Sequence, residues 1–493
     1  MPDDYELSAG LNPADATDGY RLTPSGYSNL EVFLNGVADG QIDLAPYKRA
    51  KTVERRNFFH AVVSPTATPG VTSQGQTYFP TIAAAVAAAE QKATKDSPYY
   101  IFIEAGTYNE HVEINKPYIH LTGQSRDRVI ITDNKNKDDN GNIGKTATVY
   151  VNANDVTLDN LTISNTYGQG KQALALYTLG DRVSVTQCRI NGWQDTYRTG
   201  RNGQRHLVRE CRISGTTDFI YNAGDVFFDR DTLQLTNSTN VIVAPTHINP
   251  QWGYVFRDAY IAAVPGASPS GVTTDLGRPW GDTPKATFID TQLAPGVSIT
   301  PAGWRDMGGL PIQMAEYNTR DAAGQPVDLS QRKTQFTADG KTVTSKAVLT
   351  EAEAATYTIQ NVLSGSDQWQ ADLQGRILDA PVLTVNGPTL SWTDPTRQAA
   401  CFLLTVDGRC YIQTGSSMTF GGGLSPVTVS VQSVSEQGVL GRPAMAEGIQ
   451  PIVSVEAVKS GAEVPATYSL SGTRLPQPRR GINISKGKKF INQ

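Results

Sequence analysis

The sequence predicts an all-β protein, a right-handed parallel β-helix followed by a small β-sandwich. Only 18% of the 493 residues are charged, below the roughly 25% of a typical soluble domain, so long charged helices must be few. The 45 glycines and 28 prolines suit a chain that turns often. Short β-rich segments recur at intervals of 20–32 residues without helical patterns between them, which indicates stacked coils.

The recurring segments carry one apolar residue at matching positions. The segments are 156–164, 183–190, 206–213, 226–235, 254–262 and 286–293, and the matching residues are Ile163, Ile190, Ile213, Leu233, Ile261 and Leu293. Because neighbouring coils lie about 4.8 Å apart, we expect these side chains to form one inner ladder. Cys188 and Cys211 lie 23 residues apart, and we expect them to stack as buried thiols that need no disulfide.

The chain divides into four parts, of which 1–50 is a polar segment. Residues 10–19 (GLNPADATDG) are similar to the end of a calcium-binding repeat in secreted bacterial polysaccharide-degrading enzymes. Closely spaced carboxylates and carbonyls suit Ca²⁺. A solvated linker is an equally good interpretation, and truncation of the matching repeat argues against an intact calcium site.

The second part, 55–375, is the predicted β-helix. It includes an alanine-rich helix over 81–93, directly after Pro80, that we expect to cap the core. The third part, 378–445, has short alternating strands and resembles a fibronectin type III module. If Asp407-Gly408 forms a two-residue turn there, Cys410 faces Thr405 and does not pair with Cys401.

The fourth part, 446–493, contains six basic and no acidic residues between positions 474 and 489. It resembles the tails of exported proteins from Gram-negative polysaccharide degraders, although solvation alone explains such a run equally well. A second basic run, 189–212, holds six arginines and two acidic residues. We expect most of these arginines to solvate outward strand faces.

Composition and charge limit the partners of the protein. A net charge of −4 gives no general affinity for nucleic acid or anionic membranes. No run of 18 apolar residues predicts a transmembrane helix. The chain begins without the basic and apolar regions of a signal peptide. Its four cysteines form no metal-binding motif, and we expect no metal and no cofactor.

Two aspartates and a glutamine recur with the period of the coils. Gln172, Asp195 and Asp218 are each 23 residues apart, the same interval as Cys188 to Cys211. Two carboxylates on adjacent coils cannot both ionise cheaply, so one can serve as an acid and the other as a nucleophile or base. On spacing alone, a polar ladder that satisfies the turns between coils is the better interpretation.

The residues around this ladder resemble the pectin methylesterases, carbohydrate esterase family 8, over about residues 75–375. The family's segments GxYxE, QAVAL, QDTL, DFIFG and LGRPW match, in order, Gly106–Glu110, Gln172–Leu176, Gln194–Tyr197, Asp218–Asn222 and Leu276–Trp280, and a later Gly-Trp matches Gly303-Trp304. Tyr197, Tyr221 and Asn222 depart from the family's Leu, Phe and Gly. The loss of that glycine leaves the turn after Asp218 less free.

The resemblance implies a role for each matching residue in the hydrolysis of C6 methyl esters of homogalacturonan (pectin). Asp218 is the nucleophile, and Asp195 is the acid that protonates methanol and then activates water. Gln172 and Gln194 hold the oxyanion, and Arg278 keeps Asp218 ionised. The implied substrate contacts are Trp280, Tyr197, Tyr221, Trp304 and Thr107.

Several expectations follow from this resemblance. Pectin is the expected partner, and we expect a monomer. The substrate and the resemblances of the termini predict a protein that is secreted, periplasmic or on the cell surface of a Gram-negative bacterium. Two other functions remain open, a pectate or pectin lyase on the same fold and a non-catalytic pectin-binding protein, with a thioesterase-like relative as a weaker alternative.

Overall fold

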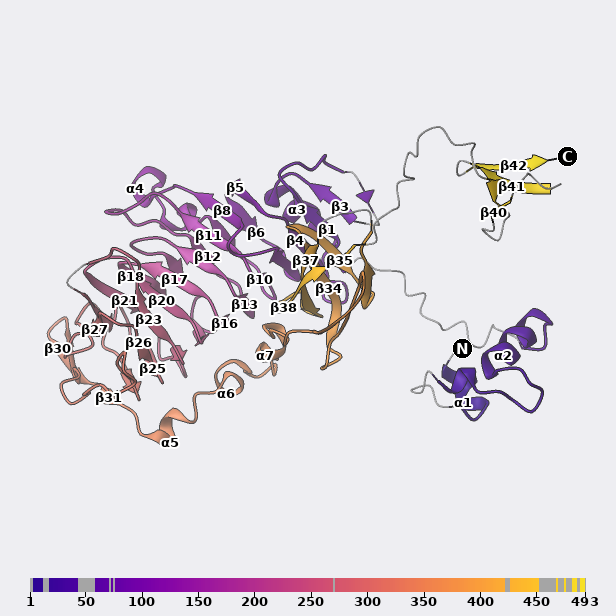
Figure 1. Ribbon diagram of the computed structural model, residues 1–493. Helices are drawn as coiled ribbons and strands as arrows, with labels where there is room; N and C mark the ends of the chain where they lie inside the picture. The colour runs from indigo at the N-terminus through magenta and orange to yellow at the C-terminus, as the bar shows by residue number, and fades with distance from the viewer. Residues whose placement is uncertain are drawn as a thin grey trace. The chain divides into compact units, whose positions relative to one another are not determined.

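Three parallel sheets form the main body of the computed structural model (Figure 1). The structure describes residues 3–11, 17–42, 58–70, 72–73, 76–268, 271–421, 426–451, 467–468, 474–475, 481–485 and 488–492. The chain divides into two units, the first comprising Met1–Leu383, Trp392–Ser416 and Val429–Met445, the second Thr384–Ser391, Ser417–Thr428 and Ala446–Gln493.

Each of the eight complete coils that the structure describes contributes one strand to each sheet, and the first sheet has five further strands. The first sheet has the order β2 (Thr72–Ser73), β3 (Gln76–Phe79), β1 (Ala61–Val63), β4 (Tyr99–Ile103), β7 (Ile119–Gly123), β10 (Thr157–Asp159), β13 (Val183–Thr186), β16 (Arg205–Arg209), β19 (Asp225–Asp229), β22 (Tyr254–Arg257), β25 (Lys285–Ile289), β28 (Gln313–Tyr317), β31 (Lys346–Val348). The second has the order β26 (Gln292–Leu293), β23 (Tyr260–Ala263), β20 (Thr232–Leu235), β17 (Arg212–Gly215), β14 (Arg189–Asn191), β11 (Thr162–Asn165), β8 (Val129–Asp133), β5 (Gly106–Asn109). The third has the order β27 (Val297–Ile299), β24 (Val272–Gly277), β21 (Thr239–Pro245), β18 (Thr217–Asn222), β15 (Tyr197–Arg198), β12 (Leu176–Thr178), β9 (Val149–Val151), β6 (Val112–Ile114).

The interior of the β-helix is a set of apolar ladders. The expected ladder from Ile163 to Leu293 is confirmed, because each of its residues pairs in register with the next. In the first sheet, the rings of Phe228, Phe256 and Phe288 stack with centroids 4.2 and 4.3 Å apart. Cys188 and Cys211 are buried free thiols on adjacent coils.

A helix covers the first coils, as the alanine-rich segment predicts. It is α3 (Ile82–Ala89), capped by the Thr81 hydroxyl, which accepts a hydrogen bond from the Ala84 amide. The Glu110 carboxylate accepts hydrogen bonds from the amides of Ile82 and Ala83, both at 2.9 Å, and so satisfies the start of the helix. The buried face of α3 packs into the apolar interior of the β-helix.

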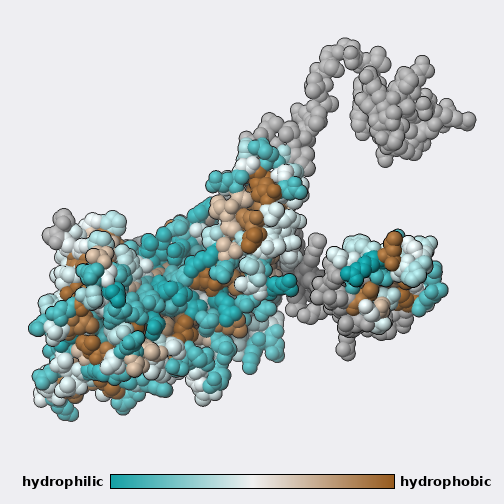
Figure 2. Space-filling view, turned by 60° about the horizontal axis from the view of Figure 1, so that its bottom comes forward, coloured by the Kyte–Doolittle hydropathy of each residue, from teal (hydrophilic) through white to brown (hydrophobic). Residues whose placement is uncertain are grey.

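After the last coil the chain passes α5 (Glu351–Ala354), α6 (Ile359–Leu363) and α7 (Ala371–Gln374), which lie along the outside of the coils (Figure 1). Val362, Leu363 and Trp369 pack against Leu207 and Phe227 on the outer face of the first sheet. The segment from α5 to α7 therefore covers apolar residues that the coils direct outward. On the surface seen in Figure 2, hydrophilic and hydrophobic residues are interspersed.

Residues 378–445 contribute strands to two antiparallel sheets. One has the order β32 (Val382–Asn386), β33 (Thr389–Thr393), β36 (Ser417–Thr419), and the other β35 (Arg409–Gln413), β34 (Ala399–Val406), β37 (Val427–Ser435), β38 (Leu440–Ile449). Leu403 and Val434 pack with Phe102 of the β-helix, and the Tyr100 hydroxyl donates to the carbonyl of Glu436 at 2.9 Å. Thr405 pairs with Cys410, which confirms the expected two-residue turn.

The remaining elements are short. They are α1 (Asp3–Ser8), α2 (Asn29–Ala38), α4 (Lys137–Asn140), the 3₁₀ helices η1 (Asp18–Tyr20) and η2 (Ile143–Thr146), the hairpin β29 (Gln335–Ala338) and β30 (Lys341–Thr344), and a sheet of β40 (Arg474–Leu475), β39 (Thr467–Tyr468), β41 (Gly481–Ser485) and β42 (Lys488–Asn492). Much of the expected calcium repeat, at 12–16, and most of the basic tail lie outside the described residues. Among the helices that the structure describes, none has the length and apolar character needed to cross a membrane.

A buried carboxyl group joins the coils to the four-stranded sheet. Asp159 accepts hydrogen bonds from the Thr186 hydroxyl (2.6 Å) and the Gln187 amide (3.2 Å), and from the backbone amide of Leu440 (2.9 Å). Burial raises the pKa of Asp159 to about 7, although these three donors act in the opposite direction. The cost of burial is therefore only partly offset by the hydrogen bonds.

We predict that Asp159→Ala lowers the free energy of unfolding by about 1–3 kcal/mol, because it leaves buried donors without an acceptor. Thermal and denaturant unfolding would measure the loss. Asp96→Ala, which removes an exposed aspartate, is the control and should change the stability little. Equal stability of the two variants would contradict this role for Asp159.

Candidate active site

One row of outward side chains crosses the third sheet from coil to coil. Tyr150, Tyr177, Arg198, Tyr221 and Ala244 occupy successive strands in register. The Tyr150 and Tyr177 rings stack at 4.8 Å, and the Arg198 guanidinium lies over the Tyr177 ring, also at 4.8 Å. Three members of the row, Arg198, Tyr221 and Ala244, line a cavity of about 140 Å³.

Two aspartates meet at this cavity. Asp195 lies two residues before β15, and Asp218 lies in β18. Both side chains line the cavity, although the two residues are only 5% and 7% exposed. Both have left-handed backbones, with φ of 64° and 48°. Such conformations are uncommon outside glycine and concentrate at functional sites. Seventeen other non-glycine residues among those described share this conformation, so it does not by itself mark the two aspartates.

Hydrogen bonds fix the orientation of both carboxyl groups. Arg278 donates from Nε and Nη2 to the two oxygens of Asp218, at 2.9 and 2.6 Å, in a bidentate pair. The Gln172 amide donates from Nε2 to Oδ2 of Asp195 at 2.9 Å. Its Oε1 accepts a hydrogen bond from Lys137 Nζ, also at 2.9 Å, so the amide cannot turn without losing both contacts.

The two carboxyl groups differ in their electrostatic surroundings. Burial, and then the charge of Asp218, raise the pKa of Asp195 to about 7. The positive charges of Lys137 and Arg198 and the hydrogen bond from Gln172 act in the opposite direction. The hydrogen bonds to Asp218 raise the pKa of Arg278. One carboxyl group is thus a proton donor near neutral pH, and the other is held by a cation.

The register differs by one residue from the expected ladder. Gln172 forms a backbone bridge with Gln194 and not with Asp195. On the next pair of coils Tyr197 pairs with Ile220, and this pairing keeps the 23-residue offset between the two aspartates. The Gln172 side chain nevertheless reaches Asp195. Gln194 is brought beside Gln172 through its backbone but is not among the residues that line the cavity.

The residues expected to contact substrate fall into two groups. Trp280 and Tyr221 line the cavity, with their rings edge to face at 5.8 Å, and Trp280 is 42% exposed. Tyr197 and Trp304 are 0% and 1% exposed and belong to the apolar interior, so their expected substrate contact is wrong. Thr107 lies in β5 of the second sheet and does not line the cavity.

The sequence did not reveal five other residues of the cavity wall. Besides Lys137 and Arg198, they are Ile143, Ala244 and Met307. Lys137 begins α4, outside every recognised motif, and its backbone amide also donates to the Gln172 carbonyl at 2.9 Å. Arg198 belongs to the arginine-rich run, which was the one available signal for it.

The departure from glycine at Asn222 is accommodated in the fold. Asn222 has a φ of 95°, in the left-handed region that a glycine would adopt easily. Its side-chain amide donates to the carbonyls of Thr199 and Gly200 at 2.9 and 2.6 Å. The lost freedom of the turn is therefore compensated by two buried hydrogen bonds.

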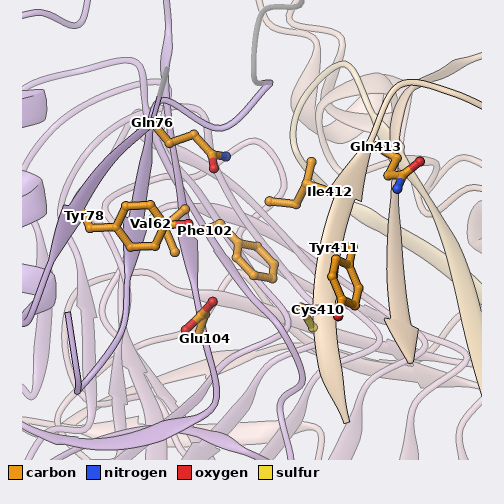
Figure 3. A pocket seen from close by; sticks show the side chains of 9 residues that line it. All are labelled: Val62, Gln76, Tyr78, Phe102, Glu104, Cys410, Tyr411, Ile412 and Gln413. Atoms are coloured by element: carbon orange, nitrogen blue, oxygen red, sulfur yellow. The ribbon is translucent and has the colours of Figure 1, made fainter. Parts of the chain in front are cut away.

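A second hollow, of about 210 Å³, lies between the first coils and β35 (Figure 3). Its walls include Val62, Tyr78 and Phe102 on one side and Ile412 on the other, and Glu104 is the charged residue in its lining. A single carboxylate offers no acid–base pair, so we assign the chemistry to the smaller cavity. Among the described residues, no cluster of three or more His, Cys, Asp or Glu side chains is arranged to hold a metal.

A family model named pectinesterase matches residues 69–366. The chain belongs to the pectinesterase family. It is 34% identical over 254 residues to pectinesterase 2 of Citrus sinensis, a match that covers 50% of this chain and 49% of that relative. Two solved pectin methylesterases, from Erwinia chrysanthemi and from carrot, each have 26% identity and a TM-score of 0.51, and the matches cover 64% and 63% of this chain and 98% and 94% of theirs.

The relatives overturn the expected location of the protein, and they are longer than the part that this chain matches. The curated relatives at 27–34% identity come from Citrus sinensis and Arabidopsis thaliana, so the expected location in a Gram-negative bacterium is wrong. The chain spans about half or less of the length of these relatives.

We predict that Lys137→Met raises the pKa of Asp195 above about 7, because it removes a positive charge that lowers it. Nuclear magnetic resonance titration of the carboxyl carbons would follow the change, with Asp195→Asn to identify the signal. The control is Lys145→Met, an exposed lysine nearby in the sequence, for which we expect no shift. An unchanged or lowered pKa in Lys137→Met would contradict the arrangement.

Proposed function

We propose that the protein hydrolyses the C6 methyl esters of homogalacturonan to galacturonate and methanol. The observation that supports this most strongly is the pair formed by Asp195 and Asp218 in one cavity, where only Asp218 is held by an arginine. A neutral acid beside an ionised nucleophile is the combination that ester hydrolysis needs. Membership of the pectinesterase family supports the same substrate.

In the first step, an oxygen of Asp218 attacks the C6 carbonyl carbon and the carbonyl electrons move to its oxygen. Gln172 then stabilises this oxyanion through its amide, with Gln194 as the proposed second donor. The intermediate collapses as the C–O bond to the methoxy group breaks, and Asp195 gives its proton to the departing oxygen. Methanol leaves, and Asp218 holds the galacturonate as an anhydride.

In the second step, Asp195 is ionised and removes a proton from a water molecule. The resulting hydroxide attacks the same carbonyl carbon, the bond to Asp218 breaks, and galacturonic acid leaves and gives its proton to the solvent. Asp195 regains its proton and Asp218 its charge, so the cycle closes without another reactant. Arg278 favours the departure of Asp218 because the bidentate pair stabilises the carboxylate.

The aromatic wall of the cavity suits a sugar chain. Trp280 offers an exposed ring face next to Tyr221, and aromatic rings pack well against the apolar faces of pyranoses. We propose that both residues contact the substrate. Lys137 would act through Gln172, because its hydrogen bond directs the Gln172 amide group toward Asp195.

We also propose that residues 378–445 are a fibronectin type III-like module and that the protein is a monomer. The module's seven described strands, β32 to β38, form one sheet in the order β32-β33-β36 and another in the order β35-β34-β37-β38. This connectivity supports the module. We likewise propose that residues 1–50, 55–375 and 446–493 are separate parts of the chain, namely the polar segment, the β-helix and the basic tail.

We predict that Asp218→Asn and Asp195→Asn each lower methanol release from esterified pectin by at least about 100-fold, because each removes a reacting group. Asp339→Asn is the matched control, since Asp339 is exposed and has a φ of 49°, close to that of Asp218. Full activity in either active-site variant would contradict the mechanism. Unsaturated products absorbing in the ultraviolet would indicate a lyase instead.

We predict that kcat/KM for methanol release falls as the pH rises through about 7. Asp195 must be protonated to serve as the acid, and its pKa is raised to about 7 by burial and by Asp218, against the effects of Lys137 and Arg198. A pH–rate profile on one pectin at constant ionic strength would measure this alkaline limb. A rate that stays constant from pH 6 to pH 9 would exclude Asp195 as the acid.

A further inference from the structure

Arg198 lines the catalytic cavity without a hydrogen-bond or ion-pair partner among the described residues. Its Nε is buried and unpaired, whereas the two Nη atoms are not among the buried groups. The guanidinium is held instead by aromatic rings, 4.8 Å from the centroid of Tyr177 and 5.8 Å from that of Tyr221. A cation in this position keeps its hydrogen-bond donors available to a ligand.

Three of the five other arginines of the same run, 189–212, have carboxylate partners, whereas Arg201 and Arg212 have none among the described residues and do not line the cavity. Arg189 pairs with Asp127, Arg205 with Asp181 and Asp367, and Arg209 with Asp229 and Asp372. These arginines serve the packing of coils and covering segments. Arg198 differs from them because it lies at the cavity and leaves its charge uncompensated by a direct contact.

The cavity as a whole carries an excess of positive charge. Arg278 neutralises Asp218, and Asp195 is uncharged below its raised pKa of about 7, which leaves the charges of Lys137 and Arg198. Beside Arg198, the Tyr221 hydroxyl is also buried without a partner, and burial raises its pKa, so it stays a hydrogen-bond donor. Two donors and an unbalanced positive charge favour an anionic group.

We propose that Arg198 binds the free carboxylate of an unesterified galacturonate that neighbours the ester being hydrolysed. The protein would then act preferentially on partly de-esterified chains, an inference that rests on the proposed function. A planar guanidinium can form charge-assisted hydrogen bonds to a carboxylate, and a neutral methyl ester offers only a carbonyl oxygen in the same place. Arg198 is therefore a residue that determines specificity for the acid form of the neighbouring sugar.

The test compares Arg198→Gln with wild type on pectins of low and high esterification. We expect kcat/KM on the low-ester pectin to fall about tenfold, which corresponds to about 1.4 kcal/mol, mainly through KM. On the high-ester pectin we expect little change. Arg201→Gln, which removes an exposed arginine of the same run that does not line the cavity, should behave as wild type on both substrates.

A binding measurement separates this inference from the proposed function. Trigalacturonate carries no ester, and calorimetry should find weaker binding to Arg198→Gln than to wild type or Arg201→Gln. Equal binding, or an equal proportional loss of kcat/KM on both pectins, would overturn the inference. If the wild type binds trigalacturonate through Arg198 but releases no methanol from any pectin, the proposed function fails and the binding site remains.

A salt titration of the wild type covers the case in which Arg198→Gln does not fold. Added NaCl screens a charge–charge contact, so KM for the low-ester pectin should rise more steeply with salt than KM for the high-ester pectin. Arg198→Lys, which keeps the charge but not the planar group, should retain part of the preference. Identical salt dependence on the two pectins would overturn the inference.

Discussion

The stacking of the coils in register is the constraint on which the site depends. The backbone pairing of Tyr197 with Ile220 keeps Asp195 and Asp218 one coil apart on the same side of the third sheet. The same pairing directs Arg198 and Tyr221 outward into the cavity and their neighbours into the core. A shift of one residue would exchange the two sets, because successive side chains of a strand face opposite sides.

The apolar ladders supply the stability that fixes this register. Aliphatic and aromatic side chains repeat at the same position from coil to coil, so each coil buries its inner face against the next. The end of such a stack leaves apolar surface to cover. Here α3 packs at the first coils, and strands of the C-terminal region bury Phe102 and Tyr100 on the outer face.

Within this rigid frame, the site balances buried charges of both signs. Asp218 is stabilised by Arg278, whereas burial and the neighbouring Asp218 raise the pKa of Asp195 to about 7. Lys137 connects this pair to α4 through the amide of Gln172. The remaining positive charge faces the cavity, which suits the proposed substrate, a polymer that gains negative charge as its methyl esters are hydrolysed.

Spacing and motif residues are local properties of the chain, so the repeat, the ladder from Ile163 to Leu293 and a shared site for Gln172, Asp195, Asp218 and Arg278 could be predicted from them. The burial of Tyr197 and Trp304, and the contact of Lys137 with Gln172, depend on how the coils fold together and could not be predicted in this way. At the site, strands β12 and β15 of the third sheet have only three and two residues. Such short strands show too little alternation for the sequence to reveal which side chains face inward. The cavity wall also combines residues from loops far apart in the chain, and their meeting depends on how every intervening coil stacks.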